Sequence, residues 1–175
     1  MAISKLTFTY SADPIYGNSY DVVKNKAPTY SYYYLDNNTG EYVKGNEFVQ
    51  VYEKFAKMLR TDAGMFSTAY EMARWIIALQ SKRLLKDENS LKTMWTPVRL
   101  NNGQLGGFGG ILNGYALGWP VVERTQHPAV APIGGGRAAF FIYPQDHLSI
   151  ILLTNLTGCS PEEIIDKIAK FYFKD

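Results

Sequence analysis

The feature that most constrains this chain is a pair of apolar segments joined by a short turn near its C-terminal end. Residues 138–143 form an unbroken apolar run, residues 148–153 are nearly as apolar, and a Pro-Gln-Asp turn at 144–146 joins them. A strand with one face in water alternates apolar and polar residues, and neither run alternates. We therefore expect an antiparallel hairpin whose two faces are both covered by other parts of the protein.

Three consecutive glycines precede this hairpin, at positions 134–136. Because glycine has no side chain, another backbone or a ligand can approach the chain closely here. We expect any binding site to lie along this glycine edge. Arg137, the next residue, is a candidate for binding a substrate carboxylate, and the alternative is a strand arginine that faces solvent.

The rest of the chain carries helix and strand patterns. Apolar spacing and capping residues predict helices at 46–60, 68–81, 88–95 and 160–172. Capping boxes begin two of them, at Thr68 with Glu71 and at Ser160 with Glu163. The last helix has an expected apolar face made of Ile164, Ile165, Ile168, Phe171 and Tyr172.

Strands are predicted at 5–12 and at 114–122, the second interrupted at Gly118 and Pro120, and a hairpin at 29–43 with its turn at 36–40. Three tyrosines of that hairpin, at 30, 32 and 34, would share one strand face. They form either an aromatic platform for a sugar or peptide, or an ordinary packed strand surface.

Composition excludes several classes of protein. The net charge of +2 gives no reason to expect a nucleic-acid partner. The single cysteine, Cys159, permits no internal disulfide, and two histidines and one cysteine fall short of metal-ligand spacing, so no metal or cofactor is expected. The first ten residues lack the apolar core of a signal peptide, which leaves the compartment unassigned, with the cytoplasm as the expectation from these residues alone. No segment is long and apolar enough to span a membrane.

Three segments in order resemble a known family. They are A-G-M-F-S-T-A-Y-E-M-A-R-W (63–75), G-Y-A-L-G-W (114–119) and the glycine-led hairpin at 134–155. Together they resemble the C-terminal half of the serine β-lactamase-like family, which includes class C β-lactamases, D-Ala-D-Ala peptidases and related esterases. We expect a single domain over 1–175, with 1–61 loosely matched and 62–175 forming the family-like core.

The resemblance implies an α+β fold in which an antiparallel sheet has flanking helices, including a C-terminal one. It also implies acyl transfer through a covalent serine intermediate. Such enzymes use an S-x-x-K nucleophile motif, a Y-x-N motif and a K/H-T/S-G motif on a sheet strand. No S-x-x-K occurs in these residues, and the sequence therefore reads as beginning after that motif.

The other two motifs match only in part. Tyr16-Gly17-Asn18 satisfies Y-x-N, which makes Tyr16 a catalytic candidate; the alternative is a turn. The strand motif aligns with Ile133-Gly134-Gly135, so the family's cationic and hydroxyl residues are absent there. By resemblance, the backbone N–H of Gly136 would supply one oxyanion-hole donor. These residues and Arg137 are the expected substrate-binding edge.

Two functions remain open. The chain is either the C-terminal portion of a serine β-lactamase-like hydrolase, inactive without a nucleophile, or a non-catalytic module. Such a module would bind an extended peptide at the glycine edge, or pair with a second copy of itself as a homodimer through the sheet edge. A third constellation, Cys159 with His147 and Asp146, is disfavoured because Cys159 lies at the far end of its strand from the turn.

Overall fold

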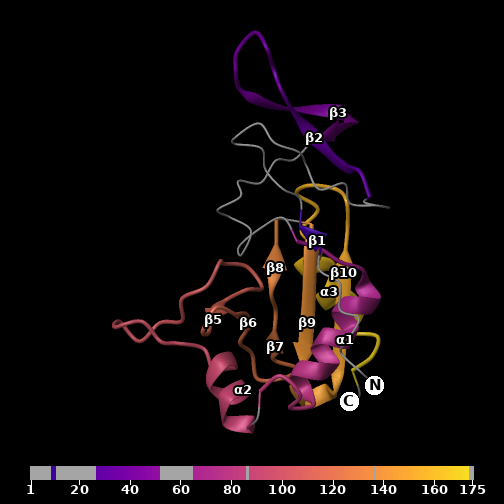
Figure 1. Ribbon diagram of the computed structural model, residues 1–175. Helices are drawn as coiled ribbons and strands as arrows, with labels where there is room; N and C mark the ends of the chain where they lie inside the picture. The colour runs from indigo at the N-terminus through magenta and orange to yellow at the C-terminus, as the bar shows by residue number, and fades with distance from the viewer. Residues whose placement is uncertain (1–8, 11–26, 52–64, 86, 136, 174–175) are drawn as a thin grey trace.

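The computed structural model describes residues 9–10, 27–51, 65–85, 87–135 and 137–173. Its centre is an antiparallel sheet (Figure 1). The strands run in the order β10-β9-β7-β6-β5, and β8 follows β7 along the same edge of β9. Their bounds are β5 Gly114–Tyr115, β6 Pro120–Val122, β7 Ala129–Val130, β8 Ile133–Gly134, β9 Ala138–Tyr143 and β10 Leu148–Leu153.

The predicted C-terminal hairpin is confirmed. β9 and β10 pair in unbroken antiparallel register from Leu148↔Tyr143 to Leu153↔Ala138. A 3-10 turn over Pro144–Asp146 joins them, and His147 completes the turn with φ +52°. The turn is short and local, so the two apolar runs meet directly.

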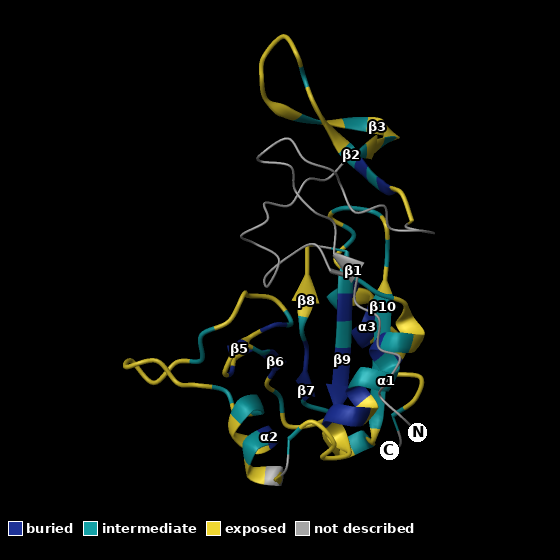
Figure 2. Cartoon of the chain, in the orientation of Figure 1, coloured by how far each residue is buried: buried dark blue, intermediate teal, exposed yellow. Residues whose placement is uncertain are grey.

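Helices cover both faces of this hairpin, as the lack of alternation predicted. The helix α3 (Pro161–Ala169) packs Ile165 and Ala169 against Phe141 and Tyr143 of β9. The helix α1 (Ala69–Gln80) packs Ile76 against Ile142, whose side chain points to the opposite face. Figure 2 shows the result as a largely buried β9 between the two helices. The fold is α+β, as expected.

The helices predicted to begin near 68, 88 and 160 all start there, and side-chain caps form at two of the three starts. The Thr68 side chain accepts a hydrogen bond from Glu71 N at 3.2 Å, which caps α1. In the same way Asp87 caps α2 (Glu88–Trp95), accepting from Ser90 N at 2.9 Å. The capping box at Ser160 is wrong: this residue has φ +49°, and its side chain makes no cap bond.

The expected apolar face of the last helix is only partly correct. Its buried residues are Pro161, Ile165, Asp166 and Ala169. Ile164 and Ile168 are partly exposed, and Phe171 and Tyr172 are strongly exposed. The reason is that α3 ends at Ala169, so the helical period that would have turned the last two aromatics inward does not continue.

A second hairpin projects from the sheet (Figure 1). It pairs β2 (Thr29–Leu35) with β3 (Tyr42–Val51) in antiparallel register. The predicted hairpin is therefore confirmed, but the helix predicted from 46 is wrong through Val51, since these residues continue β3. The remainder of that predicted helix, 52–60, lies outside the described residues.

The three tyrosines of this hairpin do not form one platform. A register shift between Ser31 and Tyr33 interrupts the two-residue alternation. The Tyr32 ring packs on Phe48 at a centroid distance of 4.3 Å, whereas Tyr34 is exposed. The packed-surface alternative fits Tyr32, and the sugar or peptide platform stays a prediction without a continuous aromatic face.

Main-chain hydrogen bonds attach this hairpin to the end of β10. Tyr30 N donates to Asn155 O at 2.7 Å, and Thr157 N donates to Tyr30 O at 2.8 Å. The Asn155 side chain adds a bond to Pro28 O at 2.9 Å. A shorter pair joins β1 (Thr9–Tyr10) to β4 (Met65–Phe66), which are the described part of the strand predicted at 5–12 and the segment before α1.

The single strand predicted over 114–122 is instead two strands folded back on each other. Gly114 pairs with Val121 and Tyr115 with Pro120 in an antiparallel hairpin. Gly118, with φ +78°, lies in its turn, a conformation that favours glycine. Among the described residues, no helix has the length and apolar character needed to cross a bilayer.

Candidate functional site

The glycine edge lies where β8 ends. Ile133 and Gly134 pair with Ala139 and Ala138 of β9. Both residues of β8 are exposed, Ile133 by 36%, while β9 beside it is largely buried (Figure 2). Among the described residues other than its chain neighbours, none has a heavy atom within 4 Å of the position a Cβ would take at Gly134. This part of the edge is therefore open to the approach of a ligand backbone.

Gly135 forms the turn from β8 into β9. Its φ of +59° is a conformation that residues with side chains rarely adopt. Arg137 N donates to Gly134 O at 3.2 Å and closes the turn. A Cβ built at Gly135 would lie 3.4 Å from Arg137 Nη2, so the guanidinium rests against the glycine. The backbone conformation is what favours glycine here.

Arg137 is half-buried and held on several sides. Its carbonyl accepts from both Thr154 N and Thr154 Oγ1, each at 2.9 Å. Its Nη1 donates to Thr29 Oγ1 at 3.0 Å. The side chain therefore lies between Gly135 and Thr29 and does not extend freely into solvent. It places a positive charge beside the glycine edge, where the strand itself offers only Ile133.

The structure does not describe every expected site residue. Tyr16 and Gly136 lie outside the described residues. Within the described ranges, no serine hydroxyl bonds a lysine; Ser67 Oγ, for example, donates to Glu71 Oε2 at 3.3 Å. The same part of the chain holds no group of three or more His, Cys, Asp or Glu side chains placed to bind a metal ion. The glycine edge thus presents a backbone surface and one cation.

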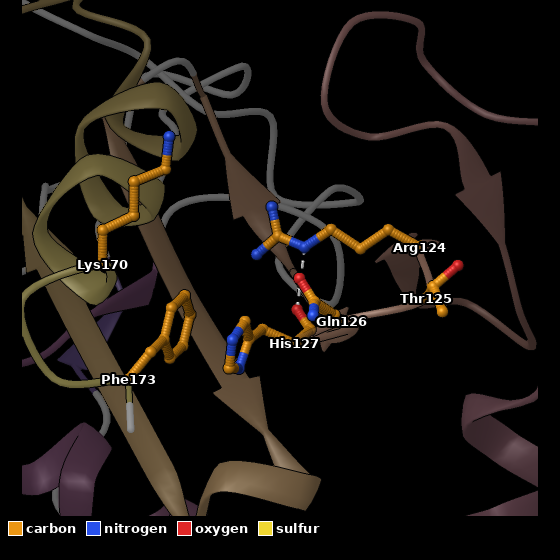
Figure 3. Close-up of a pocket in the computed structure, with 6 residues that line it drawn as sticks. All are labelled: Arg124, Thr125, Gln126, His127, Lys170 and Phe173. Carbon is orange, nitrogen blue, oxygen red and sulfur yellow. Dashed lines mark hydrogen bonds between the residues drawn. The ribbon is translucent and has the colours of Figure 1, made fainter. Parts of the chain in front are cut away.

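A second polar cluster, which the sequence did not reveal, lies near the opposite end of β9. His127 Nδ1 is 2.7 Å from Asp146 Oδ1. The His127 ring stacks on Phe173, with centroids 3.8 Å apart and planes 3° from parallel. Figure 3 shows the two rings together, with Arg124 and Lys170 on two sides of the hollow above them.

Arg124 links the loop before β7 to α3. Its Nη2 donates to Asp166 Oδ1 at 2.8 Å and its Nη1 donates to Asp166 Oδ2 at 3.2 Å. Tyr143 Oη donates to the same carboxylate at 3.4 Å. Burial, and then the negative charge of Asp166, raise the pKa of Tyr143 well above its usual value, while the Arg124 charge opposes the shift.

The constellation of Cys159, His147 and Asp146 is not formed. Cys159 Sγ lies 3.0 Å from Thr154 Oγ1, and the Asp146 carboxylate bonds His127. The antiparallel pairing of Val130 with Ile142 explains why the Asp146 carboxylate bonds His127. It brings the residues just before β7 beside the turn after β9, so His127 approaches Asp146 although nineteen positions separate them.

Comparison with known proteins agrees with this architecture. The sequence matches the family described as Beta-lactamase over residues 14–172. The chain belongs to the beta-lactamase family. A penicillin binding protein from Bacillus halodurans has a similar fold, with a TM-score of 0.53 and 16% sequence identity. The alignment covers 86% of this chain and 42% of that one, so this chain spans less than half the length of that protein. No curated protein matches the sequence.

Membership of this family supports a hydrolase-type function and confirms the resemblance drawn from the three segments. The similarity to the penicillin binding protein supports the fold alone, because the identity is low. The antiparallel sheet, with α1 on one face and α3 on the other, is therefore the part of the beta-lactamase fold that these residues provide.

Proposed function

We propose that this chain forms the sheet-side wall of a beta-lactamase-like acyl-transfer site and is inactive in acyl transfer by itself. The observation that carries the proposal is the glycine edge: an open backbone at Gly134 beside the guanidinium of Arg137. A substrate carbonyl could align along this backbone, with Arg137 close enough to attract a carboxylate. The nucleophile would come from S-x-x-K residues outside these 175, because the motif does not occur within them.

The individual roles follow from that assignment. Ile133, Gly134 and Gly135 shape the edge, and the Gly136 N–H would donate to an oxyanion. One backbone donor, without a nucleophile, leaves no group to form the covalent intermediate. Tyr16 as a proton-transfer residue and the single-domain division over 1–175 remain predictions.

The experiment is covalent labelling of the purified chain with a fluorophosphonate and with a fluorescent penicillin, read by intact mass. We expect no adduct on this chain, while an active serine β-lactamase treated in parallel gains one label. An adduct on any serine of this chain would overturn the proposed inactivity. Adding a polypeptide that carries an S-x-x-K segment tests the other half, since the adduct should then form on that polypeptide.

A second candidate function is strand addition at the sheet edge. Among the described residues, β8 pairs only with β9, which leaves its outer edge available to an extended peptide or a second copy of the chain. Sedimentation velocity tests self-association. Ile133→Lys puts a charge on this edge and should shift a dimer toward monomer, whereas Ile164→Lys, at a similarly exposed position (39%) on α3, should not. A monomer at all concentrations would exclude the homodimer.

A further inference from the structure

A hollow of about 420 Å³ lies at the end of the sheet opposite the glycine edge. Its lining residues are Arg124, Thr125, Gln126, His127, Lys170 and Phe173 (Figure 3). Five strand steps of ~3.3 Å separate the two ends of β9, so the hollow is about 17 Å from the glycine edge. It is therefore a separate place from the proposed acyl-transfer site.

Arg124 offers hydrogen-bond donors to this hollow. A guanidinium has five N–H groups in a fixed fork. Three of them are used: Nε donates to His127 O at 2.9 Å, and two reach the Asp166 carboxylate. The two remaining N–H groups have no partner among the described residues, and the side chain is 31% exposed. These bonds hold the Arg124 guanidinium in place, and its two remaining N–H groups are available to a ligand.

Lys170 and His127, which also line the hollow, add a second cation and an imidazole nitrogen. Lys170 is exposed and makes no ion pair within the described part of the chain. A carboxylate only accepts hydrogen bonds, so His127 Nδ1 carries the proton that it shares with Asp146. The nitrogen of His127 left for a ligand is therefore Nε2. The Phe173 ring fixes the imidazole by stacking on it.

Two carboxylates lie close to the hollow and would repel an anion, but each already bonds other side chains. Asp166 faces Arg124 and Tyr143 Oη, and it is 12% exposed as a side chain. Asp146 bonds His127 through Oδ1, and its Oδ2 is buried with no hydrogen-bond partner among the described residues. Of the described side chains that line the hollow, Arg124 and Lys170 carry a permanent charge, and both are cations.

We propose that this hollow binds a small oxyanion, a phosphate or carboxylate group, between the spare N–H groups of Arg124 and the ammonium of Lys170. Charge-assisted bonds from two cations suit such a ligand. Because the hollow is open to solvent, salt should weaken the interaction. Neither the acyl-transfer proposal nor the strand-addition proposal requires this site, so each can fail without the other.

The chain carries its own reporter for the test. It contains two histidines: His127 in the hollow, and His147 exposed on the turn before β10. Inorganic phosphate is titrated into the full 175-residue chain at constant pH and ionic strength, while the two imidazole ring signals are followed by NMR. A His147→Gln variant assigns the signals. We expect a saturable shift of the His127 signal and a flat His147 signal. Acetate in place of phosphate distinguishes a carboxylate ligand from a phosphate ligand.

A matched pair of lysine variants completes the experiment. Lys170→Gln removes the free cation of the hollow and should weaken phosphate binding about fivefold, the effect of one solvent-exposed charge contact. Lys167→Gln removes an exposed cation of α3, three residues earlier and outside the lining, and should leave binding unchanged. The proposal is overturned if the His127 shift does not saturate, if sodium chloride alone produces it, or if the two lysine variants behave alike.

Discussion

Replacing Tyr143 by phenylalanine should reduce the loss of folding stability that this protein suffers at alkaline pH. Tyr143 is fully buried in the α3 face of the sheet, and its hydroxyl lies 3.4 Å from Asp166 Oδ1. Burial, followed by the nearby carboxylate, raises the pKa of this phenol in the folded state. In the unfolded chain the same phenol ionises near its usual pKa of about 10.

The size of the effect follows from proton linkage. The contribution of Tyr143 is complete below about pH 10 and falls as pH rises further, because the unfolded state then loses a proton that the folded state keeps. One proton corresponds to a slope of about 1.4 kcal/mol per pH unit, so wild type should lose about 1.4 kcal/mol relative to Tyr143→Phe by about pH 11. Near neutral pH the variant should cost only about 0.5 kcal/mol, because the lost bond is long and Asp166 keeps Arg124.

Urea unfolding of both proteins at several pH values, followed by circular dichroism, measures this difference. The contributions of all other groups are common to both proteins and cancel in the comparison. If the two stability curves remain parallel from neutral pH to about pH 11, then Tyr143 is not held protonated by its surroundings. The packing of Asp166 beneath it would then have to be reconsidered.

Three further predictions concern helix ends and the core. Thr68→Ala should cost about 1 kcal/mol in urea unfolding, whereas Ser160→Ala should cost little, since Ser160 makes no cap bond. The hydrogen bond from the Ser90 side chain, then that from Ser90 N, lowers the pKa of Asp87. The stability that this bond adds is present above the unfolded pKa and is lost as pH falls through the folded one; Asp87→Asn should flatten the acid limb of the stability curve. Ile165→Ala should cost about 3 kcal/mol, and Ile164→Ala at the partly exposed neighbour below about 1 kcal/mol.

The elements that the sequence predicted well are those whose determinants are local. The hairpin of β9 and β10 needs only a proline turn and two adjacent apolar runs. Helix α1 begins at Thr68 because the capping side chain and the N–H it satisfies lie three residues apart. Both patterns could be read without knowing which distant segments pack together.

The failures arise where tertiary pairing overrides the local pattern. Residues 46–51 carry helical apolar spacing, yet they continue β3, whose residues 49–51 pair with residues 29–31 of β2. None of the residues of β3 is buried, so its regularly spaced apolar side chains do not pack into a core. At Ser160 the left-handed backbone directs the side chain away from the cap, although the residue type and its spacing from Glu163 are those of a capping box.

The glycine edge and the hollow differ in how far apart their residues lie in the sequence. The glycine edge consists of consecutive residues, so its position could be predicted from the sequence even though its function could not. The hollow brings Arg124 and His127 from one loop together with Lys170 and Phe173 from the chain end. Only the register of β7 against β9, and the packing of α3 on that face, makes them neighbours. A prediction of strand pairing, which needs nonlocal information, would have placed His127 beside Asp146 and revealed the hollow.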